Sequence, residues 1–224
     1  MPNARLEVVD LSNNCITYFG DWSFNPRLRI LKLGGNLLTS LRGDISRNVF
    51  LRHLDLSNNR LTRLAELPST LFVEELLVAN NRLTSLEGLE SFGQLTTLDV
   101  HGNLLKWLHP VCAETHPHLM YVDVGANPEF GDVRLLTPLA GSRLLCSINL
   151  FPGPFEEVKW LRIKIIHMLT HLEFLNGEPV TSEEKVEVEE VYGAELSEQR
   201  QVWERLLPGE AFLDRRVLKA HELN

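Results

Sequence analysis

The sequence is poor in cysteine and in long hydrophobic runs. Its 224 residues include three cysteines, Cys15, Cys112 and Cys146, which lie far apart. Secreted repeat proteins usually carry paired cysteines in caps at their ends, so this pattern favours a reducing, cytoplasmic compartment. The first fourteen residues hold no apolar run long enough for a signal peptide, and no stretch approaches the ~20 apolar residues of a membrane span. We therefore expect a cytoplasmic protein without a membrane span.

Basic residues are scarce relative to acidic ones. The chain has 22 Lys and Arg against 30 Asp and Glu, a net charge of −8. A protein that binds the phosphate backbone needs many cations, so we expect no direct binding to nucleic acid. Hydrophobic residues make up 44% and charged residues 23% of the chain, which allows a buried core.

Common catalytic motifs are also missing. The sequence contains no P-loop, no GxSxG and no HExxH. We predict that the chain is not an enzyme and that it needs no cofactor.

Histidines form two groups that resemble metal ligands. His167 and His171 have helical spacing but no accompanying glutamate, and we expect one to face the core and the other the solvent. A second group could bind zinc, yet prolines mark its segment as a turn, so we predict no metal site. It consists of His109, Cys112, His116 and His118.

A repeated pattern dominates the rest of the chain. The stretch Leu51–Leu61 reads Leu-x-x-Leu-x-Leu-x-x-Asn-x-Leu, and six copies can be written between residues 6 and 127. The alternating apolar positions predict a short strand with one buried face. The asparagine can donate and accept hydrogen bonds in the following turn. The asparagines recur in steps of 22, 23, 22, 22 and 24 residues, at Asn14, Asn36, Asn59, Asn81, Asn103 and Asn127.

This pattern is identified as the leucine-rich repeat, a unit that buries its apolar side only when copies stack. A degenerate seventh copy begins at Leu145 and has Gly153 in place of the asparagine. The returns between strands are about a dozen residues long, which favours one 3₁₀ or helical turn in each repeat.

After the repeats the pattern becomes helical. Apolar residues at 161, 165, 166 and 169 predict a helix, and 172–175 a last short strand that ends at Asn176-Gly177. Thr181 and Glu184 have the spacing of a capping box, which opens another helix. Together with the 22-residue steps, this run resembles the carboxyl-terminal cap of cytoplasmic leucine-rich-repeat proteins of the 22-residue type. The matching positions are Arg162, Ile165, Ile166, Leu169, Leu172, Leu175, Asn176, Gly177, Val180, Glu183 and Glu184.

The resemblance covers about residues 6–192 and implies a non-enzymatic binding scaffold. The family includes dynein- and tubulin-linked, ciliary, phosphatase-regulating and spliceosomal A-prime-type proteins. It therefore implies protein partners in the cytoskeleton, cilium or flagellum, such as microtubule or axonemal proteins. The alternatives are a regulatory subunit of an enzyme such as a phosphatase, or a spliceosomal A-prime-like adaptor.

We therefore expect an α/β fold: a curved, right-handed leucine-rich-repeat solenoid with a parallel sheet on its concave face. The expected divisions are repeats over 1–157, a cap over 158–181 and a helical tail over 182–224. In the tail, residues 188, 192, 196, 203 and 207 share one helix face. This face either packs back on the repeats or, around Trp203, docks on another protein.

Strand residues that flank the central apolar position should face the concave surface. Asp99 and Asp123 would then lie on adjacent strands, with carboxylates about 5 Å apart. Such a surface is either a hydrated polar face or a groove for a basic or mixed-polarity protein segment. We predict that a partner binds there, at Asp55, Glu75, Leu77, Asp99, Tyr121 and Asp123.

Two other surfaces are open to interpretation. Arginines that follow the asparagines could face an acidic partner or simply add solubility. The first repeat starts at Leu6 and leaves almost no room for a cap, so its edge is covered by a partner, covered by a second copy, or bare. The oligomeric state stays open at this point. The arginines are Arg42, Arg47, Arg60, Arg63 and Arg82.

Overall fold

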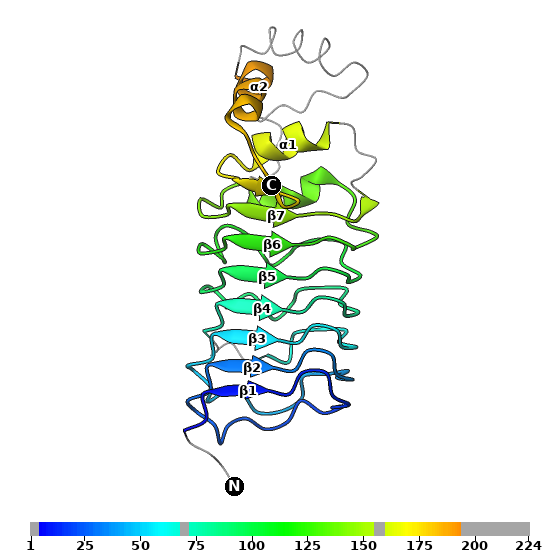
Figure 1. Cartoon of the computed structure of the whole chain (residues 1–224), viewed down its shortest axis with the longest axis vertical. Helices are drawn as coiled ribbons and strands as arrows, with labels where there is room; N and C mark the ends of the chain where they lie inside the picture. Colours follow the sequence, from blue (N-terminus) through cyan, green and yellow to red (C-terminus); the bar gives the residue numbers. More distant parts are fainter. Residues whose placement is uncertain (1–4, 68–71, 155–159, 194–224) are drawn as a thin grey trace.

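A computed structural model of the chain describes residues 5–67, 72–154 and 160–193 (Figure 1). Seven short parallel strands stack in sequence order, β8 continues the sheet in parallel, and β9 closes it in antiparallel orientation. The fold is a curved leucine-rich-repeat solenoid, as predicted. The strands are β1 (Val8–Asp10), β2 (Ile30–Lys32), β3 (His53–Asp55), β4 (Glu75–Leu77), β5 (Thr97–Asp99), β6 (Tyr121–Asp123), β7 (Ser147–Asn149), β8 (Phe174–Leu175) and β9 (Glu178–Pro179).

The strands stack without any shift in register. The first residue of each strand faces the first residue of the next, from Val8 and Ile30 up to Tyr121 and Ser147. In β2 to β7 the central residue is fully buried, for example Leu54 and Leu98 in β3 and β5. The two flanking residues of each of these six strands therefore lie on the opposite, solvent-facing side of the sheet.

The repeated asparagines connect neighbouring turns. Asn59 Nδ2 donates to the carbonyls of Leu33 at 3.0 Å and Leu56 at 2.9 Å, while its Oδ1 accepts from the backbone N–H of Leu38 at 2.9 Å. The residue before each such asparagine has a left-handed backbone, with φ of 55° at Asn58. Each buried asparagine thereby satisfies backbone groups that the turn would otherwise leave unpaired.

The returns close with single 3₁₀-type turns, as predicted: Leu67 N–H donates to Leu64 C=O at 2.9 Å and Val111 N–H to Leu108 C=O at 2.8 Å. In the described residues, one return goes further and forms a 3₁₀ helix, η1 (Val133–Leu139). Elsewhere the return closes with isolated bonds such as Leu89 N–H to Leu86 C=O, at 3.2 Å. The physical reason is length, because a return of about a dozen residues that must also bury Phe92 has no room for consecutive helical bonds.

Two helices and two short strands follow the repeats at the carboxyl end. Helix α1 (Leu161–Met168) is followed by β8 and β9 and by α2 (Ser182–Tyr192). Thr181 and Glu184 form the predicted capping box. Glu184 also receives two bonds from the guanidinium of Arg162, which joins α2 to α1.

Ring stacking holds the same two helices together. The rings of His167 and Tyr192 stack with centroids 3.5 Å apart. His167 is buried and His171 exposed, as predicted for this pair. The tail from residue 194, including Trp203, lies outside the described residues.

Strand β1 forms the first edge of the sheet. Its only paired neighbour in the described part of the chain is β2. Val8 is 54% exposed, while Val9 and Ile16 pack against the core from a half-buried position. Whether a partner or a second copy covers this edge, or whether it stays bare, is not tested by the structure of the single chain.

Candidate functional site

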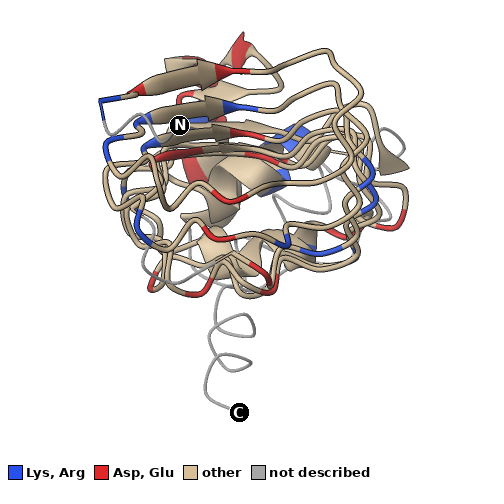
Figure 2. Ribbon diagram, turned by 90° about the horizontal axis from the view of Figure 1, so that it is seen from below, with Lys and Arg blue, Asp and Glu red and all other residues tan. Residues whose placement is uncertain are grey.

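The six predicted site residues share the solvent-facing side of strands β3 to β6. Seen along the solenoid axis, the strands form one wall of the tube, and this wall carries both acidic and basic residues (Figure 2). Asp99 and Asp123 are direct register partners across β5 and β6. Glu75 is exposed, and the other five side chains are half-buried. The predicted side chains are Asp55, Glu75, Leu77, Asp99, Tyr121 and Asp123.

The aspartates have a structural role that the sequence analysis missed. Each accepts a bond from the backbone N–H two residues later: Ser57 to Asp55 at 2.9 Å, His101 to Asp99 at 3.0 Å, and Gly125 to Asp123 at 2.9 Å. Such a bond closes the turn after the strand. An Asp at the end of the strand with a turn residue two positions later is the sequence signal that could have predicted this hydrogen bond.

Asp123 is the centre of a hydrogen-bond network. The Tyr121 hydroxyl donates to its carboxylate at 3.3 Å, Asn149 Nδ2 donates to it at 3.1 Å, and His101 Nδ1 lies 3.3 Å from it. Asn149 Nδ2 also donates to the Tyr121 hydroxyl at 2.9 Å. Burial, with the charges of Asp123 and Asp99, raises the pKa of Tyr121 to about 12, so it stays neutral. The sequence analysis did not place His101 or Asn149 in the site.

Asp99 is held much more loosely. The one hydrogen bond that its carboxylate makes to described residues comes from the backbone of His101. Burial raises the pKa of Asp99, and the charges of Asp123 and Asp55 add to this, against the lowering effect of the His101 N–H. No Lys or Arg occurs in β4, β5, β6 or β7. We call Asp99, Tyr121, Asp123 and Asn149 the acidic strip.

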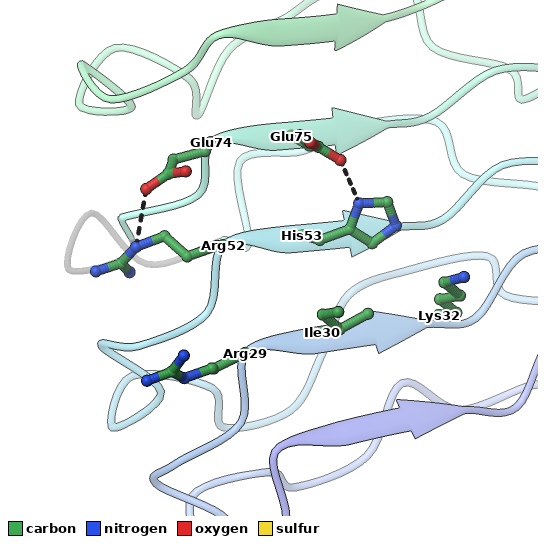
Figure 3. A pocket seen from close by; sticks show the side chains of 7 residues that line it. All are labelled: Arg29, Ile30, Lys32, Arg52, His53, Glu74 and Glu75. Atoms are coloured by element: carbon green, nitrogen blue, oxygen red, sulfur yellow. Dashed lines mark hydrogen bonds and ion pairs between the residues drawn. The ribbon is translucent and has the colours of Figure 1, made fainter.

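Glu75 belongs to a different feature. It lines an open hollow of about 450 Å³ over β2, β3 and β4, and the other five predicted residues do not (Figure 3). Glu75 Oε2 lies 2.6 Å from His53 Nδ1. The structure thus divides the predicted site into the acidic strip and this hollow. The hollow is lined by Arg29, Ile30, Lys32, Arg52, His53, Glu74 and Glu75.

The arginines of the second candidate surface are partly used within the chain. Glu66 pairs with Arg63 at 3.1 Å and with Arg42 at 3.6 Å, and it also accepts the backbone N–H of Leu41 at 2.6 Å. Arg60 and Arg82 are exposed. Binding of an acidic partner at this edge remains a prediction.

The second histidine group is spread out. His116 is buried, with Nε2 3.0 Å from the Leu89 carbonyl and Nδ1 2.7 Å from Thr115 Oγ1, while His109 and His118 are exposed. Burial lowers the pKa of His116, so its ring is neutral. Across residues 5–67, 72–154 and 160–193, no three His, Cys, Asp or Glu side chains come together as metal ligands would. In those same ranges no helix has the length and apolarity needed to cross a bilayer.

Comparison with known proteins identifies the repeats and the fold. The family described as "Leucine rich repeat" matches residues 4–61, and no curated protein matches the chain. The solved structures that are similar to it include three that carry leucine-rich repeats. An internalin of Listeria monocytogenes has a TM-score of 0.59 at 20% identity, covering 77% of this chain and 47% of its own. A leucine-rich-repeat protein of Leptospira interrogans has 0.58 at 21% identity, covering 82% and 52%.

The third similar structure is an octameric complex of Latrophilin 3, Unc5D and FLRT2, in which FLRT2 carries the leucine-rich repeats. Its TM-score is 0.56 at 20% identity, covering 75% of this chain and 52% of the other. The chain thus spans about half the length of the three solved chains that it matches. At these identities the likeness shows the fold alone.

Proposed function

We propose that this leucine-rich-repeat protein is a non-enzymatic scaffold that binds a basic segment of a partner protein on its concave face. The observation that carries the proposal is the pairing of Asp99 with Asp123 on adjacent strands, with no Lys or Arg in β4 to β7. Two neighbouring carboxylates repel each other unless a cation lies between them. A lysine or arginine of a partner would supply that cation.

Neighbouring side chains fit the same partner. Leu77, half-buried on β4, offers an apolar contact next to Asp99, its register partner. Tyr121 offers an aromatic ring beside Asp123, and its hydroxyl already has a partner, so the ring is fixed in place. Aromatic anchors and complementary charges are the usual sources of affinity and specificity in such interfaces.

The setting that we propose is cytoplasmic, in a cytoskeletal or ciliary assembly with microtubule or axonemal proteins as partners. The resemblance of the 22-residue steps and of the cap to cytoplasmic members of the family supports it. The three cysteines are unpaired, in keeping with a reducing compartment.

Charge-removing variants test the proposal. Asp99→Asn and Asp123→Asn keep an oxygen that can accept the turn-closing N–H, but remove both charges. Asp10→Asn is the matched control, because Asp10 accepts the Ser12 N–H at 3.0 Å in the equivalent turn of the first repeat. Affinity purification with mass spectrometry should lose its main partner with the double variant and keep it with the control.

Two other results would redirect the proposal. An unchanged partner set in the double variant would show that the concave strip is the wrong surface. Recovery of a phosphatase or of spliceosomal proteins, in place of cytoskeletal ones, would favour the regulatory-subunit or adaptor alternative.

A further inference from the structure

In the hollow over β2 to β4, the carboxylates have basic partners within the hollow, but two of the basic residues have no acidic partner there. Its two carboxylates are both engaged with basic residues of β3 or its start: Glu74 lies 3.0 Å from Arg52, and Glu75 lies 2.6 Å from His53 (Figure 3). Arg52 also donates to the backbone carbonyl of Val49 at 3.0 Å. Both carboxylates of the hollow are therefore engaged by side chains of the chain itself.

The β2 side keeps two cations that face no carboxylate of the hollow. Arg29 and Lys32 flank Ile30, and neither is joined to Glu74 or Glu75 (Figure 3). The side chain of Arg29 is 64% exposed and pairs with Glu7 at 3.9 Å. Lys32 has no ion pair within 4.0 Å among the described residues, although, with the hydrogen bonds from Ser12, its charge helps to lower the pKa of Asp10. This side thus combines the apolar Ile30 with two cations that no carboxylate of the hollow engages.

Aspartates on the adjacent strands limit how strongly this side attracts an anion. Asp10 and Asp55 are the register partners of Lys32, and each is already bonded to the backbone of its own turn. A polyanion such as a nucleic acid would meet these carboxylates and the acidic strip as well, and would be repelled. A short acidic group on an otherwise mixed-charge segment avoids that repulsion.

The spacing between the hollow and the acidic strip sets the distance between the two charges. From β2 to a point between β5 and β6 are three and a half strand spacings, or about 17 Å at ~4.8 Å each. An extended peptide covers ~3.3 Å per residue, so about five residues bridge this distance. Leu77 on β4 lies between the two ends and faces the middle of such a peptide.

We infer that the occupant of the concave face is an extended protein segment of mixed charge. Its acidic end binds beside Arg29 and Lys32, which lie just before β2 and at its end (Figure 3), its basic end binds on the acidic strip about five residues away, and an apolar residue between them contacts Leu77. The inference rests on the proposed function and adds the charge order and spacing of the partner segment.

Synthetic peptides test the inference on the full chain. The first probe, EESLSKK with a fluorescent label, places paired acids five residues from paired bases around a leucine. QQSLSKK keeps only the basic end, and EKSLSEK has the same composition as the first probe with the charge order broken. At low salt we expect EESLSKK to bind about fivefold more tightly than either of the others in fluorescence anisotropy.

Variants assign that difference to the hollow. In the chain with Arg29→Gln and Lys32→Gln, EESLSKK should bind no more tightly than QQSLSKK, whose own affinity should not change. Arg82→Gln with Lys185→Gln, an equal loss of two charges at exposed positions outside the hollow, should leave the fivefold difference intact. Thermal melting of each variant checks that it is folded.

The possible failures are distinguishable. If QQSLSKK binds and Asp99→Asn with Asp123→Asn weakens it, but EESLSKK binds no more tightly, the inference is wrong and the proposed function stands. A fivefold difference that survives the loss of Arg29 and Lys32 also overturns the inference. If neither peptide binds, the acidic strip is not a site for a basic segment, and both proposals fall.

Discussion

Asn176 Oδ1 accepts a hydrogen bond from the backbone N–H of Leu150 at 2.8 Å. This bond differs from those of the five earlier junctions, where the asparagine of the next repeat accepts from the N–H two residues after the previous asparagine, as Asn127 does from Leu105 at 2.9 Å. The seventh repeat has Gly153 at its own asparagine position. Asn176, directly after β8, therefore does not continue the asparagine ladder but ties the end of β7 to the segment that follows the repeats.

Removing this acceptor should weaken the junction. Asn176 has a φ of 55°, so Asn176→Gly keeps the left-handed backbone and deletes only the side chain. We expect a loss of about 1–2 kcal/mol in the free energy of unfolding, because the Leu150 N–H is left without its partner. Urea denaturation measures it. Asn176→Asp, which retains an acceptor oxygen, should lose much less, and equal losses would contradict the role of the bond.

Asparagines inside the repeat array should contribute more to the free energy of unfolding than the asparagine of the first repeat. Asn81→Ala removes donors to the Leu56 and Val78 carbonyls and the acceptor for the Leu61 N–H, all in a buried turn. We expect a loss of about 3 kcal/mol. Asn14 is exposed, so Asn14→Ala should lose less than about 1 kcal/mol. Chemical denaturation of both variants gives the comparison, and similar values would disprove the structural ranking.

Ala126 has an unfavourable backbone that glycine would relieve. Its φ is 53°, whereas the equivalent positions of repeats two and five are Gly35 and Gly102. Ala126→Gly should raise the free energy of unfolding by up to about 1 kcal/mol, since relief of left-handed strain exceeds the entropy that glycine adds to the unfolded chain. Ala79→Gly, at a buried alanine with no positive φ, should be destabilising. Thermal melting distinguishes the two, and a fall in melting temperature for Ala126→Gly would refute the prediction.

His116 should make stability depend on pH. Burial lowers its pKa in the folded chain, so the folded state resists protonation while the unfolded state takes up a proton near pH 6.5. Its contribution is complete above that pH and is lost as the pH falls below it. We therefore expect the free energy of unfolding to fall between about pH 7.5 and 5.5, and His116→Gln to reduce this slope. An identical slope in the variant would rule out His116 as the cause.

The architecture could be predicted because each repeat contains the same local sequence pattern. The strand of every copy falls on the apolar-x-apolar positions, and the capping box of Thr181 and Glu184 marks the start of α2 within the sequence itself. These signals are local and periodic, and stacking them requires no knowledge of distant contacts. The returns carry apolar residues without a period, so the extension of one return into the longer helix η1 could not be predicted from the pattern.

For the site, the sequence predicted only which residues occupy equivalent positions on neighbouring strands. Register places Asp99 beside Asp123 once the repeats are aligned. The bond from Asn149 to Asp123 spans 26 residues and crosses into the degenerate repeat, where alignment was weakest. The hollow depends on Arg52 turning toward Glu74, and neither spacing nor residue type determines that choice.

Each coil of the solenoid touches mainly the coil before it and the coil after it. Bending is therefore a sum of small independent hinge movements, and nothing within the sheet couples β2 directly to β6. A ligand that contacts several of these strands would restrict movement between several neighbouring coils at once. Binding of that ligand would make the whole solenoid more rigid, so that a ligand on the concave face would alter the flexibility of the convex face.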